Sequence, residues 1–258
     1  MMVQSDMTER AAVPPSGLVR TSSDTASWHA VYDGLHDAII RHRLDPGAKL
    51  VEEEIAEVFG VSRTIVRAAL QALARDGVVI LQRNKGARIA HPTPDEAREI
   101  FEARELIEPR IAALAAGRMN TGDAERLHAC LHAEHQAMAS DEPREAVYHS
   151  ANFHRLVAGI AGHQLLSGIL GDLLSRSSLV IALYWRMPQA LCENEAHHAI
   201  VDSLAAGDQD RAATLMRQHI AALLGQLDLS ERPQRQSSLA EALRDAARVP
   251  KGTRVLAR

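Results

Sequence analysis

The sequence predicts a mostly α-helical protein in two parts: a small N-terminal unit in which three helices precede a β-hairpin, then an all-α bundle of six or seven helices. Three observations lead to this prediction. Alanine and leucine abound while aromatic residues make up only 3 % of the 258 residues, a composition typical of helices. Apolar residues recur at helical spacing along most of the chain. β-Branched residues cluster in one short stretch near residues 78–90, which favours strands there.

Composition excludes several classes of protein. Hydrophobic residues make up 46 % of the chain, enough to fill real cores. The sequence contains no apolar run of about 18 residues, and its start lacks the apolar core of a signal peptide. Cys130 and Cys192 are too few for a disulfide framework or a thiolate zinc cluster. We therefore expect a cytoplasmic protein without a membrane span or redox chemistry.

Charge is distributed unevenly along the chain. The net charge is -4, but by count of Lys+Arg against Asp+Glu residues 1–92 are neutral, residues 93–229 carry -8 and residues 230–258 carry +4. Within the first part, residues 59–90 hold six basic side chains and one aspartate. Such a local excess attracts phosphate, although basic surface residues alone do not identify a partner.

The N-terminal elements follow from periodicity and turn residues. Residues 1–26 are polar and aperiodic, so we expect a disordered arm. Helical spacing from Trp28 ends at Arg43, where "LDPG" supplies a turn. "EEEIAEVFG" predicts a short second helix that stops at Gly60.

A third helix begins after Ser62, which is placed to cap its first turn, and runs to Asp76-Gly77. "VVILQ" and "ARIA" then predict two strands joined by the tight turn "RNKG" at residues 83–86. Helix, helix-turn-helix and hairpin in this order form a winged helix-turn-helix domain over residues 27–90.

The third helix has one polar face that is free to meet a partner. On a helical wheel the aliphatic residues share one side, and Arg63, Thr64, Arg67 and Gln71 share the other. A helix fits the DNA major groove, where arginine can bind guanine through two hydrogen bonds and threonine can touch a base edge or a phosphate. The hairpin turn could contact the backbone or the minor groove through Arg83, Asn84, Lys85 and Gly86. The alternative is a solvated amphipathic helix with no ligand.

Residues 31–90 resemble the DNA-binding domain of the GntR superfamily of bacterial transcription regulators, with "DPG", "FGVSRT", "VRAAL" and "DGVV" in register. The resemblance implies DNA contacts from Ser62, Arg63, Thr64 and Arg67 and from the wing residues Arg83 to Gly86. Two positions depart from the family pattern. Ile65 replaces a proline, and Glu53 replaces an arginine that often contacts DNA, so that contact is not expected here.

After a linker at residues 91–94, residues 95–229 predict an all-α domain. The helices are expected at 95–118, 121–139, 142–161, 163–186, 190–206 and 208–228, interrupted by "TGD", "DEP", "GH", "MP" and "GD". Residues 230–258 form a basic tail that we expect to be disordered, with at most one weak helix.

Three histidines of this domain fall on apolar helix faces: His154, His197 and His219. A single inward histidine is usually a hydrogen-bonded core residue. Three on separate helices of one bundle indicate a site for Zn²⁺, Ni²⁺ or Mn²⁺. By contrast, the stripe His128, His132 and His135 is interpreted as a solvated face that could at most capture stray metal.

The bundle resembles the effector-binding FCD domain of the FadR branch of that superfamily, through "AREIFEARELIEPRIAALAA", "NFHRLVAGIAGH" and "AHHAIVDSLAAGDQDRAATLMRQHI". The resemblance implies a divalent metal, zinc in the first place, held by His154, His197 and His219. Ser150 stands where metal-binding members carry Asp or Asn, and a hydroxyl is a weaker ligand. It also implies a small carboxylate effector, for which Arg104 and Arg176 are candidate ligands. Both arginines could instead form salt bridges within their helices, with Glu108 and Asp172.

Together these features predict a homodimeric repressor on a palindromic operator in double-stranded DNA, because one recognition helix contacts too few base pairs for specificity. A carboxylate bound in the bundle would release the DNA. One alternative is a sensor for which the cation itself is the signal. Another is a three-histidine hydrolase with His149 or Glu195 as base, which lacks any nucleophile motif or catalytic carboxylate pair, so we expect no enzyme.

Overall fold

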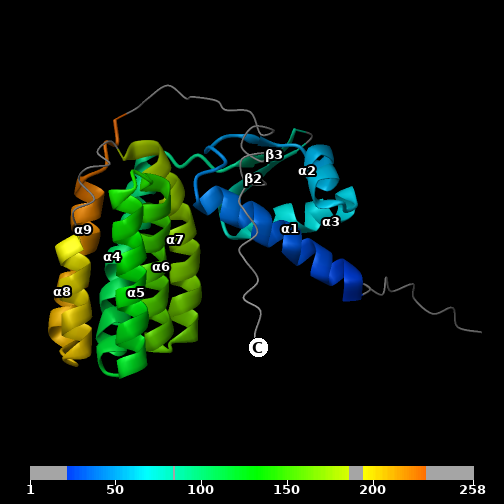
Figure 1. Cartoon of the computed structure of the whole chain (residues 1–258). Coiled ribbons are helices and arrows are strands. Elements are labelled where there is room, and N and C mark those ends of the chain that lie inside the picture. Colours follow the sequence, from blue (N-terminus) through cyan, green and yellow to red (C-terminus); the bar gives the residue numbers. More distant parts are fainter. Residues whose placement is uncertain (1–21, 84, 186–193, 231–258) are drawn as a thin grey trace, which may run out of the picture.

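A winged helix-turn-helix unit and a six-helix bundle lie side by side in the computed structural model, which describes residues 22–83, 85–185 and 194–230 (Figure 1). This confirms the predicted fold class. The arm before Ser22, Asn84 of the wing, the start of the fifth bundle helix and the basic tail after Ser230 lie wholly or partly outside the described residues.

The N-terminal unit contains three helices and three strands. These are α1 (Ser22–Ile40), β1 (Lys49–Leu50), α2 (Glu52–Phe59), α3 (Arg63–Arg75), β2 (Val79–Gln82) and β3 (Gly86–Ile89). The predicted bounds of the first helix were wrong at both ends. It begins earlier, at Ser22, and it ends before Arg43 because His42 adopts a left-handed backbone with φ 54°.

The sheet has the order β1-β3-β2 and is antiparallel throughout. In the hairpin, Val79 pairs with Ile89 and Gln82 with Gly86, as the positions of the two predicted strands require. Strand β1 was not predicted, because two residues after a turn carry no alternation that a sequence pattern can show. It pairs Lys49 with Arg88 and anchors the wing beside the start of α2.

The turn between α2 and α3 sets the direction of the third helix. Gly60 ends α2 in the left-handed region, with φ 64°, which costs a glycine little. Ser62 then caps α3, and its Oγ accepts a hydrogen bond from the Ile65 N–H at 3.4 Å. A proline at position 65 could not donate this bond, so the departure at Ile65 adds a cap contact.

The bundle follows the predicted order of helices. Its members are α4 (Pro94–Ala116), α5 (Thr121–Ala139), α6 (Pro143–Ala161), α7 (Gln164–Tyr184), α8 (Asn194–Ala205) and α9 (Gln209–Gly225). Thr93 and Glu96 form a reciprocal capping box that starts α4 directly after the linker. Apolar side chains from all six helices form one core.

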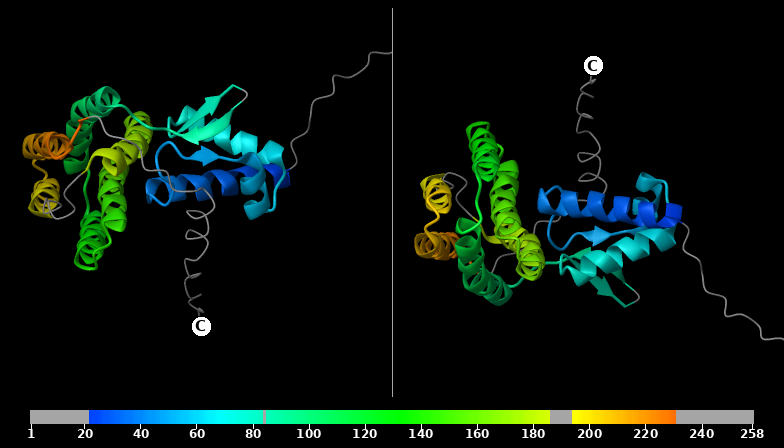
Figure 2. Two further views of the ribbon diagram at one scale, coloured as in Figure 1. Left: turned by 90° about the horizontal axis from the view of Figure 1, so that it is seen from above. Right: turned by 90° about the horizontal axis from the view of Figure 1, so that it is seen from below.

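Helix α7 belongs to both units (Figure 2). Its Leu179 is fully buried in the core of the winged helix-turn-helix unit, and Tyr184 donates a hydrogen bond to the Pro92 carbonyl of the linker at 2.8 Å. By length and composition α7 alone among the described helices could cross a membrane. Here it packs against α1, α4 and α6, and 39 % of its apolar window is buried inside the protein.

His42 closes the contact between the two units. Its Nε2 lies 2.8 Å from Ser178 Oγ on α7, and that hydroxyl donates to the Ile40 carbonyl at 3.1 Å. The hydroxyl proton is thereby used, so the imidazole Nε2 is the donor to Ser178. Burial lowers the pKa of His42 to about 4, the Ser178 bond opposes this change, and Arg144 adds to it. The folded protein therefore holds this imidazole neutral.

Acid should loosen this contact. Between the unfolded pKa of about 6.5 and the folded pKa of about 4, the unfolded chain binds the proton more tightly, so stability falls as pH falls through that window. We expect His42 to contribute about 2 kcal/mol of the loss in free energy of unfolding between pH 8 and pH 5. His42→Asn, which tolerates the left-handed backbone, should remove that share in urea titrations. An unchanged pH dependence in His42→Asn, compared with His128→Asn on the surface, would contradict this role.

Candidate functional site

The polar face of α3 lines an open groove between the helix-turn-helix and the wing. The groove has a volume of about 560 Å³, and its walls include Arg63, Arg67 and Gln71 of α3 and Lys85 and Gly86 of the wing. The structure thus brings four residues of the predicted DNA-contacting set, Arg63, Arg67, Lys85 and Gly86, to one open groove, and leaves Ser62, Thr64 and Arg83 exposed to solvent.

One carboxylate contacts both arginines of this face. Glu52, the first residue of α2, places its two carboxylate oxygens 2.9 and 3.0 Å from Arg67 Nε. The same carboxylate lies 3.8 Å from Arg63 Nε. Sequence inspection had singled out the neighbouring Glu53, which is exposed at the groove. Only the angle between α2 and α3 shows which glutamate meets the arginines.

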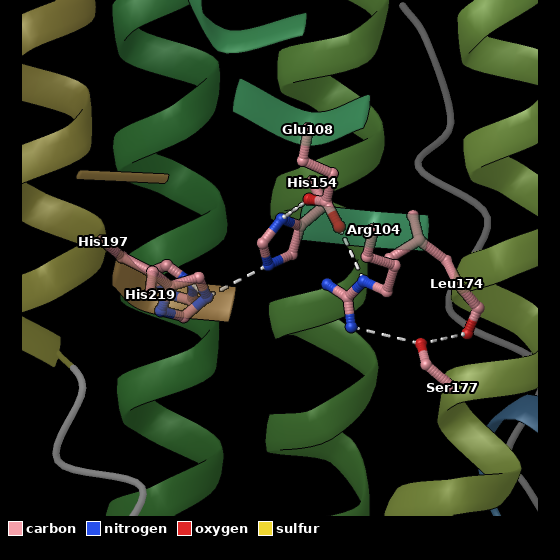
Figure 3. Close-up of polar contacts among 7 residues, drawn as sticks. All are labelled: Arg104, Glu108, His154, Leu174, Ser177, His197 and His219. Atoms are coloured by element: carbon pink, nitrogen blue, oxygen red, sulfur yellow. Dashed lines mark hydrogen bonds and ion pairs between the residues drawn. The ribbon is translucent and has the colours of Figure 1, made fainter. Parts of the chain in front are cut away.

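The three predicted histidines converge in the centre of the bundle (Figure 3). His154 comes from α6, His197 from α8 and His219 from α9, and all three are at least 97 % buried. His219 Nε2 lies 3.1 Å from His197 Nε2 and 3.3 Å from His154 Nε2. Three imidazole nitrogens therefore point at one another in an apolar core.

Carboxylates hold the far sides of two of these rings. Glu108 Oε2 lies 2.5 Å from His154 Nδ1, and Glu134 Oε2 lies 3.1 Å from His197 Nδ1. Ionised carboxylates only accept hydrogen bonds, so both Nδ1 atoms carry the proton and both Nε2 atoms present lone pairs. A proton on His219 Nε2 can satisfy only one of them. The arrangement fits a cation at the three Nε2 atoms, with carboxylates orienting the ligands as in many metal sites.

Burial favours the neutral, ligating forms of His154 and His219. Burial raises the pKa of Glu108, but Arg104 and His154 outweigh it and bring the pKa down to about 2. Burial lowers the pKa of His154 against the opposing effect of Glu108, and it lowers the pKa of His219 far below the usual value. Neutral imidazoles are the form that metals bind.

A small cavity of about 30 Å³ opens beside His154. Arg104, Ser150 and Ser177 supply polar groups to it, and Phe101 and Leu223 are among its apolar walls. Arg104 is 2 % exposed, with its Nε 2.6 Å from Glu108 Oε1 and its Nη1 3.2 Å from Ser177 Oγ. Arg104 therefore forms the salt bridge with Glu108 and also lines the cavity, two roles that the sequence alone left as alternatives.

Arg176 does not join this cavity. It is exposed on α7, and its Nε faces the Asp76 carbonyl at 3.5 Å, at the end of α3. A Cβ on Gly77, which has φ 77°, would lie 2.2 Å from the same Nε. The side chain of Arg176 thus lies at the contact between the two units, away from the cavity beside His154.

The other candidates lie elsewhere as well. His128 and His132 are exposed on α5, and His128 and His135 have ring contacts with His198 of α8. Neither His149 nor Glu195, the bases of the hydrolase alternative, is among the residues that line the cavity. The sequence signal for Glu108 was its spacing from Arg104, whereas nothing in the pattern marked Glu134 or Glu52 as partners.

An exposed basic helix beside a wing, joined to a bundle with a buried histidine cluster and a mostly apolar cavity, defines a one-component transcription regulator. Residues 29–89 match the family described as bacterial regulatory proteins, gntR family, and residues 99–222 match the FCD domain. The chain belongs to the GntR family of transcription regulators and carries an FCD domain at its C-terminal side; it is a regulator and not an enzyme.

Similar proteins agree with this assignment. A protein of Escherichia coli K12, assigned as the regulator of the L-lactate dehydrogenase operon, is 29 % identical, covering 74 % of this chain and 82 % of its own. The transcriptional repressor GlaR of the same strain is 27 % identical, covering 78 % and 92 %. The crystal structure of a GntR transcriptional regulator from Rhodococcus sp. RHA1 aligns with a TM-score of 0.68 and 26 % identity, over 80 % of this chain and 97 % of that regulator.

Proposed function

We propose that this protein is a homodimeric repressor that binds a palindromic operator through α3 and the wing, in the cytoplasm, and releases it when a small carboxylate binds in the bundle. The main support for the proposal is that one cavity is lined both by Arg104 and by His154, a member of the three-histidine cluster. The relative named a repressor supports the direction of control, and the relative assigned to an L-lactate operon supports the class of ligand. Dimerisation follows from the short reach of one recognition helix.

The residues present fit a divalent metal. His154, His197 and His219 would hold it through Nε2, with Glu108 and Glu134 fixing their orientation. A bound divalent cation would supply an open coordination position to a carboxylate oxygen. Arg104 would bind the carboxylate from the other side of the cavity. Ser150, half-buried at the cavity, is a weaker ligand than an acidic residue and leaves room for water or effector.

Two consecutive serines of α7 connect the cavity to the DNA-binding unit. Ser177 and Ser178 both line the cavity. Ser177 accepts a hydrogen bond from Arg104, while Ser178 contacts His42 and the Ile40 carbonyl at the end of α1. A carboxylate that takes up Arg104 would change the surroundings of these serines. The ligand controls DNA binding if it binds with different affinity to two arrangements of the DNA-binding unit relative to the bundle.

A thermal-shift screen tests the proposed function. Metal-stripped and zinc-loaded protein are each exposed to small carboxylates and sugar acids, with L-lactate as the first probe. We expect a carboxylate to raise Tm only when zinc is present, because the ligand would need both the metal and Arg104. Zinc binding without any response to carboxylates would favour the alternative in which the cation itself is the signal.

Replacing Ser178 should weaken the coupling between the cavity and the DNA-binding unit. Ser178→Ala removes the hydrogen bonds to His42 and Ile40, so we expect the ligand-induced change in operator affinity to shrink by about 0.5–2 kcal/mol. Ser175→Ala is the matched control, because Ser175 contacts His36 at 3.1 Å across the same seam but does not line the cavity. Operator titrations with and without ligand measure the change. Equal coupling in the two variants would exclude this route.

A further inference from the structure

The contact of Glu52 with Arg63 and Arg67 does more than balance their charge. Glu52 is only 19 % exposed, while Arg67 and Arg63 are 61 % and 60 % exposed. The carboxylate therefore lies at the base of the groove and the guanidinium groups project from it. A flexible surface arginine loses side-chain entropy when it binds a base, and a fixed partner reduces that loss.

The position of the contact on the guanidinium group decides what remains available. Both carboxylate oxygens of Glu52 approach Nε of Arg67, at 2.9 and 3.0 Å. Among the described residues, Glu52 is the only one that forms a hydrogen bond or ion pair with Arg67. The two Nη groups are thus left for a ligand. Two parallel N–H groups of arginine are the donors that fit O6 and N7 of guanine.

The charge of Glu52 also opposes general attraction to DNA. With Arg63 and Arg67 it forms a group of two cations and one anion at the groove. Binding to any duplex depends on the number of phosphates that cations neutralise. A carboxylate at this place weakens the attraction to phosphates in DNA of any sequence. An arginine oriented for guanine, by contrast, strengthens binding only where the correct base pair is present.

We propose that Glu52 is a specificity-determining residue that orients Arg67, and more loosely Arg63, for base contact while lowering the affinity for non-specific DNA. The proposal rests on the proposed function, namely that α3 reads the operator. The Glu52 side chain would therefore strengthen binding to the operator and weaken binding to an arbitrary duplex.

The test compares two duplexes, an operator selected from a random pool and a scrambled duplex of equal length, by fluorescence anisotropy at several salt concentrations. In Glu52→Gln we expect the ratio of operator to scrambled affinity to fall about tenfold, through weaker operator binding and stronger scrambled binding. Glu53→Gln is the matched control, since it removes one negative charge from the same groove without touching either arginine. It should change both affinities by one factor and leave the ratio within about twofold.

Arg67→Ala separates the possible failures. One outcome is that Arg67→Ala lowers operator affinity while Glu52→Gln has the same effect as Glu53→Gln. That result would overturn the positioning role of Glu52 and would retain α3 as the helix that contacts the operator bases. If Arg67→Ala retains the operator affinity of the parent, α3 does not read DNA through this residue and the proposed function fails with it. Melting curves of all three variants should match the parent, because each altered side chain lies at the surface groove.

Discussion

Zinc added to the metal-stripped protein should raise its Tm by about 5–10 °C when free zinc is about a hundredfold above its Kd. The gain arises because His154, His197 and His219 already face one another through Nε2 in the folded state, whereas the unfolded chain has no such site. Differential scanning fluorimetry at neutral pH measures it. Lower pH should reduce the rise, since zinc competes with protons for imidazole nitrogens.

Two histidine variants locate the bound zinc. His219→Ala removes the ligand that contacts both other rings, so the zinc-induced rise in Tm should disappear even if the variant melts lower than the parent. His132→Ala removes an exposed histidine of the α5 stripe and should keep the full rise. A rise that survives in His219→Ala and vanishes in His132→Ala would place the zinc on the surface and overturn the buried site.

Arg63→Ala and Arg67→Ala should each weaken operator binding by about 1–3 kcal/mol, the range for losing a bidentate contact to guanine. Both side chains are about 60 % exposed at the groove, so their removal should leave the fold intact. The loss should be larger on the operator than on a scrambled duplex, because a base contact is lost along with a charge. Anisotropy titrations at fixed salt measure both affinities.

Arg75 offers the control for charge alone. It is exposed in the last turn of α3 but does not line the groove. Arg75→Ala should reduce operator and scrambled binding by similar small factors. If Arg75→Ala and Arg67→Ala have the same effect on both duplexes, the N-terminal part of α3 is not the reading surface.

The order of helices could be predicted because local signals agree with the final packing. Gly60, Ser62 and the aliphatic side of α3 determine the helix-turn-helix within a few residues of chain, and the bundle helices end where turn residues interrupt the apolar period. The first helix was misplaced because its ends depend on weaker signals. His42 takes a left-handed backbone that glycine usually provides, and it is held there by Ser178, which is distant in sequence.

The candidate site could be predicted only as far as the inward faces of single helices. Periodicity placed His154, His197 and His219 inside the bundle, and α6, α8 and α9 bring them together. The partners Glu108 and Glu134 lie on α4 and α5, and no sequence period relates one helix to the rotation of another. For the same reason Arg104 reaches the cavity while Arg176 reaches the end of α3, although both have an acidic residue four positions away on their own helix.

The most direct test is the affinity of the zinc-loaded protein for its selected operator, measured with and without the carboxylate that raises Tm in the screen. We predict that the carboxylate raises the operator Kd by about 5–150-fold, the range of ordinary allosteric coupling. A carboxylate that stabilises the bundle but leaves the operator Kd unchanged would contradict control of DNA binding by the cavity beside Arg104 and His154.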